Sequence, residues 1–137
     1  RQGERGRLER GVAVAHPPAG ARLRDEDLDN IDLFLLDVKS GDEETYQRVT
    51  KRQLQPTIDF GDRLSEKGKR VWIRFVVVPG YTDSEENVNN VADIVARWTN
   101  NVERVEVLPS AMTARAIPSA LRLWRLLGLG VCSYGRF

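Results

Sequence analysis

The chain has 137 residues, of which 41% are hydrophobic and 30% are charged, a composition that fits one ordinary globular domain. Lysine and arginine number 21 against 20 for aspartate and glutamate, so we expect neither nucleic-acid nor membrane binding driven by a broad positive field. No run is long enough to span a bilayer and the start lacks a secretory apolar core, which makes a cytoplasmic location the default expectation.

Residues 1–22 differ in composition from the rest of the chain, being rich in arginine, glycine and alanine and carrying a Pro-Pro pair. Their apolar residues show no sustained period of two or 3.6, so we expect a poorly ordered flank and a domain boundary near residue 22. The arginines there are not interleaved with aromatic residues, which argues against a nucleic-acid site. His16 is the only histidine, and no acid or nucleophile accompanies it at a catalytic spacing.

The domain expected at residues 23–109 begins with DEDLDN, a short helix or turn, and continues with IDLFLLDV (residues 31–38). The second segment is a nearly continuous apolar run, which is typical of a parallel strand covered on both faces. SGDEETYQRV then predicts a helix capped by Ser40 or Asp42. A second helix is predicted over Gln55–Lys67, ended by Gly68 as the left-handed residue.

Two further strands flank a third helix. The run from Val71 to Pro79 is β-branched and aromatic, and VERVEVLP (residues 102–109) alternates apolar and polar residues. Between them, a helix capped by Asp83 or Ser84 has one apolar face made of Val88, Val91, Ile94, Val95 and Trp98. The strand and helix alternation predicts an α/β fold with parallel pairing, and leaves barrel or open sheet undecided.

Residues 110–137 form an atypical tail with a loose helical pattern around 120–127. Its Cys132 is the only cysteine of the chain, which excludes an internal disulfide. A single thiolate cannot by itself hold an iron–sulfur cluster or a structural zinc ion.

Charged residues at the strand ends are the candidates for chemistry. Asp37 and Lys39 are two residues apart at the end of the first predicted strand of the domain, and Arg74 interrupts an otherwise apolar one. On spacing alone, Asp37 and Lys39 are either a structural ion pair or part of a ligand site. Arg74 needs a partner if it faces inward, and Glu106 on the next strand is one candidate.

Three blocks in this order, NIDLFLLDVKSGDEETYQRVT, RVWIRFVVVPGYTDSEENV and NVERVEVLP, resemble the C-terminal half of the pyruvate formate-lyase activating enzyme family. That family belongs to the radical S-adenosylmethionine enzymes. The resemblance runs from Ala21 to Pro109 and implies a partial parallel (β/α) barrel, about three βα units of a (β/α)6 barrel.

The resemblance also implies a chemistry. Family members use a four-iron four-sulfur cluster to cleave S-adenosylmethionine, and the radical removes hydrogen from a glycine of a glycyl radical enzyme such as pyruvate formate-lyase. The segment Asp37, Val38 and Lys39 would border the S-adenosylmethionine site, because it matches the family's Asp-x-Lys segment. Arg74 would lie near the cofactor or the substrate peptide, with a barrel-lining ion pair as its alternative.

The chain departs from the family pattern at both ends of the match. It has no C-x-x-x-C-x-x-C motif for the cluster, and Ser110 and Ala111 follow Pro109 where an aromatic residue and a histidine are usual. We therefore expect a truncated or frame-disrupted fragment that retains part of the cofactor site and is inactive alone. The alternative is a cluster-free α/β module that binds a nucleotide-like ligand or a protein partner.

Overall fold

The computed structural model describes residues 11–15, 22–109, 125, 126, 128 and 132–134. In chain order the elements are β1 (Gly11–Ala15), α1 (Asp25–Asp29), β2 (Ile31–Asp37), α2 (Glu43–Thr50), α3 (Gln55–Glu66), β3 (Arg70–Val77), α4 (Glu85–Ala96), β4 (Val102–Pro109) and β5 (Cys132–Tyr134). The strands form one parallel sheet in the order β1-β2-β3-β4-β5. The predicted α/β class with parallel strands alternating with helices is confirmed.

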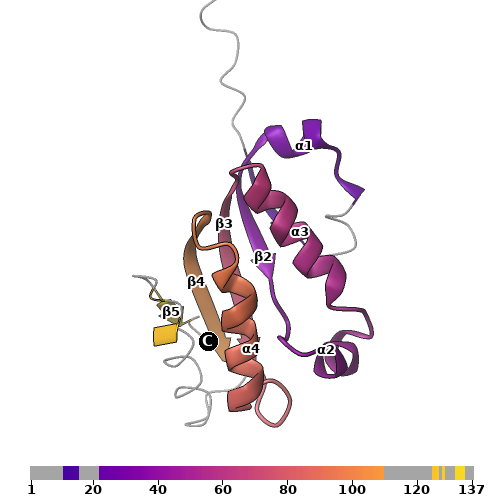
Figure 1. Ribbon diagram of the computed structural model, residues 1–137, viewed down its shortest axis with the longest axis vertical. Helices are drawn as coiled ribbons and strands as arrows, with labels where there is room; N and C mark the ends of the chain where they lie inside the picture. The colour runs from indigo at the N-terminus through magenta and orange to yellow at the C-terminus, as the bar shows by residue number, and fades with distance from the viewer. Residues whose placement is uncertain (1–10, 16–21, 110–124, 127, 129–131, 135–137) are drawn as a thin grey trace, which may run out of the picture.

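One face of the sheet carries the hydrophobic core. Alternate residues of β2 and β3 point into it, and α3 and α4 lie over this face (Figure 1). Its largest fully buried side chains are Phe34, Phe60, Phe75 and Trp98. The predicted apolar face of α4 is confirmed, since all five of its residues are buried. This packing leaves the opposite face of the sheet to residues of mixed character.

The helix ends follow local signals in the sequence. Asp42 caps α2 by accepting a hydrogen bond from the Thr45 amide at 2.9 Å, and Ser84 caps α4 by accepting from the Asn87 amide at 3.1 Å. Gly68 has φ +66° just beyond α3, as predicted for a left-handed residue. The structure thus selects one residue from each pair of predicted N-caps.

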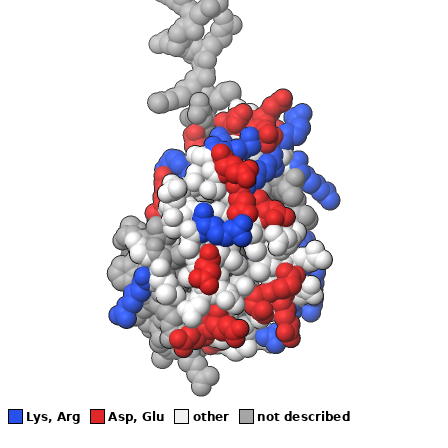
Figure 2. Space-filling view, viewed as in Figure 1, with Lys and Arg blue, Asp and Glu red and all other residues white. Residues whose placement is uncertain are grey.

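A short helix is attached to the end of α3 by charged side chains. Asp25 of α1 lies 2.7 Å from the Arg63 guanidinium and 3.3 Å from the Lys67 ammonium. Figure 2 shows acidic and basic side chains intermixed over this end of the molecule. The pKa of Asp25 is lowered below its ordinary value of 3.8. The largest cause is the hydrogen bond from Arg63, and the second largest is the hydrogen bond from Lys67.

The structure differs from the sequence expectation at the two outer strands. Gly11–Ala15 lies inside the flank expected to be poorly ordered, yet it pairs with β2 in parallel. Cys132 begins β5 in the tail, which pairs with β4. Both strands are too short to have a recognisable period, so only their pairing identifies them. His16 and most of the helix expected at 120–127 lie outside the described residues.

Candidate functional site

Charged side chains meet on the sheet face that the helices leave uncovered. The register pairs Asp37 of β2 with Arg74 of β3, and Arg74 with Glu106 of β4. These three residues therefore form one charged row across the sheet, on the face opposite the core. The row lies toward the carboxyl ends of the strands, which is the edge where parallel α/β folds place their ligands.

Asp37 is the centre of the contacts at this site. Its carboxylate accepts a hydrogen bond from Arg74 Nε at 2.7 Å through one oxygen, and from Lys39 Nζ at 3.3 Å through the other. The residue is only 5% exposed, whereas the side chains of Lys39 and Arg74 are 36% and 25% exposed. One negative and two positive charges give these three residues a net charge of +1. The two cationic side chains are therefore more exposed to a ligand than that of Asp37 is.

The structure brings together three of the four residues expected at the site. Asp37 contacts both Lys39 and Arg74 directly. The side chain of Val38 is instead fully buried in the core, and its amide donates to the Arg74 carbonyl at 2.9 Å. Val38 can therefore contribute to a ligand site only through its main chain.

Arg74 was expected either near a ligand or in an ion pair with Glu106. In the structure Arg74 forms an ion pair with Asp37 of β2, the strand on the opposite side of β3 from β4. Glu106 lies 3.2 Å from the Arg104 guanidinium, which also stacks 5.0 Å from the ring centroid of Trp72. The alternation of β4 placed Arg104 and Glu106 on one face, but no sequence signal indicated the stacking on Trp72.

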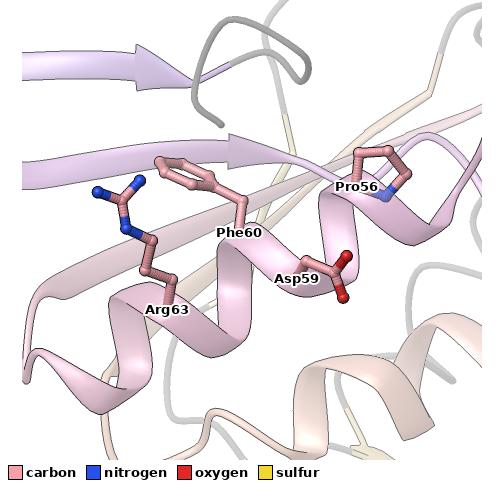
Figure 3. Close-up of a pocket in the computed structure, with 4 residues that line it drawn as sticks. All are labelled: Pro56, Asp59, Phe60 and Arg63. Carbon is pink, nitrogen blue, oxygen red and sulfur yellow. The ribbon is translucent and has the colours of Figure 1, made fainter. Parts of the chain in front are cut away.

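A separate hollow of about 380 Å³ lies on the surface of α3 and is lined by Pro56, Asp59, Phe60 and Arg63. Figure 3 shows Phe60 and Arg63 projecting to the same side of the helix. Its polar groups have structural partners: Arg63 donates to the Leu23 carbonyl, and Asp59 accepts from Gln55. None of the lining residues belongs to the charged row, so we do not assign the hollow to the candidate site.

Two absences apply to the described part of the chain. No group of three or more histidine, cysteine, aspartate or glutamate residues there is arranged to hold a metal ion. No helix among the same residues is long and apolar enough to cross a membrane.

Comparison with known proteins shows what the chain is similar to. No family model matches it. The pyruvate formate-lyase-activating enzyme of Clostridium pasteurianum is 39% identical over 103 residues, which cover 74% of this chain and 43% of that protein. The pyruvate formate-lyase 1-activating enzyme of Escherichia coli K12 is 36% identical over 85 residues, 62% of this chain and 34% of that protein.

Solved structures agree on the fold. A domain of pyruvate-formate lyase-activating enzyme from Bacteroides vulgatus superimposes with a TM-score of 0.69 at 22% identity, over 82% of this chain and 75% of that one. A radical SAM methyltransferase from Sphaerobacter thermophilus gives a TM-score of 0.54 at 18% identity, over 76% of this chain and 34% of that one.

The alternating parallel strands and helices therefore match part of radical SAM barrel structures in fold. Over part of its length, the chain is homologous to the pyruvate formate-lyase-activating enzymes. The matched segments span less than half of the curated relatives, at 43% and 34% of their lengths.

Proposed function

We propose that this chain is part of a radical-generating activating enzyme and supplies one side of an S-adenosylmethionine site. Asp37, the main chain of Val38, Lys39 and Arg74 would form that side. The observation that supports this is the Asp37 carboxylate held between two accessible cations at the carboxyl end of parallel strands. The homology supplies the identity of the ligand.

The donor set fits the amino-acid end of S-adenosylmethionine. That end carries a carboxylate, for which Lys39 and Arg74 offer donors, while the buried Asp37 carboxylate holds these two cations in place. The net charge of +1 favours the ligand carboxylate. In the family the bound cofactor supplies a carbon radical when it is cleaved reductively. The residues of this chain would bind and orient it.

The residues do not fit a four-iron four-sulfur cluster. Three thiolates are needed and the sequence has one cysteine, while the described residues contain no other metal-holding group. We derive no step through a cluster. The proposal is that the chain alone binds the cofactor without cleaving it, and that the complete enzyme acts on a glycyl radical enzyme such as pyruvate formate-lyase.

Calorimetric titration of the 137-residue chain with S-adenosylmethionine tests the proposal. We expect binding that weakens about tenfold in Lys39→Met and in Arg74→Gln, because each removes a charged hydrogen bond of about 1.4 kcal/mol or more. Lys51→Met is the matched control, since Lys51 is exposed beyond the end of α2. Binding that is unaffected by Lys39→Met would refute the assigned site.

Two further measurements separate the alternatives. Adenosine lacks the amino-acid end, so the proposal expects it to bind more weakly than S-adenosylmethionine. Equal or tighter binding of adenosine favours the cluster-free module that takes a nucleotide-like ligand. Under reducing anaerobic conditions we expect no cleavage of S-adenosylmethionine by the chain alone, and cleavage would contradict the inactivity that we propose.

A further inference from the structure

A single buried carboxamide joins the two loops that leave the carboxyl ends of β2 and β3. Asn87 lies in the first turn of α4 and is 3% exposed. Its Oδ1 accepts hydrogen bonds from Ser40 Oγ at 2.7 Å and from the Gly41 amide at 2.9 Å. Its Nδ2 donates to the Thr82 carbonyl at 2.8 Å. Both ends of the amide are thus used, one on each loop.

Each loop is also held by contacts of its own. Thr82 Oγ1 donates to the Val76 carbonyl at 3.0 Å and accepts from the Val78 amide at 2.7 Å, which fixes the exit of β3. Gly41 lies so close to α4 that an added Cβ would be 2.6 Å from the backbone carbonyl carbon of Asn90. The loops are therefore seated on the helix at their backbones, with Asn87 between them.

This arrangement fixes the residue next to the candidate site. Lys39 directly precedes Ser40, which is fully buried, and Lys39 Nζ lies 3.3 Å from Asp37 Oδ2. Lysine has a long, flexible stem, so a fixed backbone beside it reduces the positions its ammonium can take. The side-chain hydrogen bonds of Asn87 described above all join it to the two loops rather than to the charged row.

We propose that Asn87 is a positioning residue, which fixes the loop of Lys39 against α4 and thereby sets the ammonium beside Asp37. The consequence for ligand affinity rests on the proposed function. The consequence for the loop does not, because it concerns the chain without ligand.

The loop is tested by amide hydrogen exchange of the full chain, followed residue by residue by NMR. In Asn87→Ala we expect the Gly41 amide to exchange at least about tenfold faster relative to Ile73 in the core of β3, because its acceptor is lost. Asn89→Ala is the matched control, another asparagine of α4 for which the described residues show no side-chain hydrogen bond, and it should leave the ratio unchanged. An equal acceleration of Gly41 and Ile73 would mean a general loss of stability and would overturn the proposal.

Asn87→Asp provides a second variant should the alanine substitution prevent folding. It keeps the acceptor for Ser40 and Gly41 and replaces the donor to Thr82 by a second carboxylate oxygen, so any loosening should fall on the Thr82 loop rather than on Gly41. We expect Gly41 to stay within about twofold of the wild type in this variant. Loss of Gly41 protection here would overturn the proposal.

The effect on Lys39 is tested by a double-mutant cycle on S-adenosylmethionine binding. Asn87→Ala should weaken binding about tenfold in the wild-type chain and less than about twofold in the Lys39→Met background. Equal weakening in both backgrounds would show that Asn87 does not act through Lys39. If the wild-type chain binds no S-adenosylmethionine, the proposed function fails. The exchange rate of the Gly41 amide relative to that of Ile73 then decides by itself whether Asn87 holds the loop.

Discussion

At the scale of single residues, Asp37 decides whether two cations can lie side by side on a partly buried sheet face. Asp37→Asn removes the charge that Lys39 and Arg74 share. Removing one partner of a buried pair costs about 3–5 kcal/mol, and the partial exposure of both cations reduces this to about 1–3 kcal/mol. Urea unfolding measures the loss. The exposed Asp93→Asn should change the free energy of unfolding by less than about 0.5 kcal/mol, and an equal loss in the two variants would contradict the prediction.

Gly41 is the residue whose missing side chain allows the β2 loop to approach α4. The atoms nearest to an added Cβ include the backbone of Asn90 and Val91, which cannot rotate away. We predict that Gly41→Ala lowers the free energy of unfolding by about 2 kcal/mol or more, measured in urea. Gly11→Ala is the control, because nothing lies within 4 Å of its added Cβ. A Gly41→Ala chain as stable as the control would show that the loop can move off the helix.

At the scale of elements, ion pairs hold α1 against the end of α3. The contribution of these ion pairs to the free energy of unfolding should therefore vary with pH. The pKa of Asp25 is lowered in the folded chain, so its ion pairs stabilise the fold above its ordinary value of 3.8 and are lost as the pH falls through the lower folded value. We predict that the wild type loses more stability than Asp25→Asn between about pH 6 and pH 3, measured by thermal unfolding.

Salt provides the control for this prediction. Asp25 is on the surface, so added sodium chloride should screen its attraction to Arg63 and Lys67 and reduce the difference between the two chains. Parallel stability curves for the wild type and Asp25→Asn over this pH range would show that α1 is not held by these charges.

At the scale of the whole molecule, β3 should be the most stable part of the described sheet. It is the central strand of the order β1-β2-β3-β4-β5, and its core residues Ile73 and Phe75 are fully buried. We predict that their amides exchange only with global unfolding, at a free energy equal to that from urea. Leu28 in the short helix α1 should exchange faster. Similar exchange rates for Leu28 and Ile73 would contradict this ranking.

The sequence predicted those parts of the fold that have an apolar run or an apolar period of their own. β2, β3 and β4 and the helices α3 and α4 are all long enough for apolar spacing to identify them. β1 and β5 are not, with five and three residues. The assignment of residues 1–22 and 110–137 as flanks of a fragment stays a prediction.

The sequence alone determined that Asp37 and Lys39 follow a buried strand and that Arg74 interrupts another, because these facts depend on local order. Only the tertiary structure decided that Arg74 contacts Asp37, since strand register is set by packing between distant segments. It also decided that Asp42 rather than Ser40 caps α2, because the Ser40 hydroxyl donates to Asn87, 47 residues away. A local pattern specifies where polar groups occur along the chain, and long-range packing selects their partners.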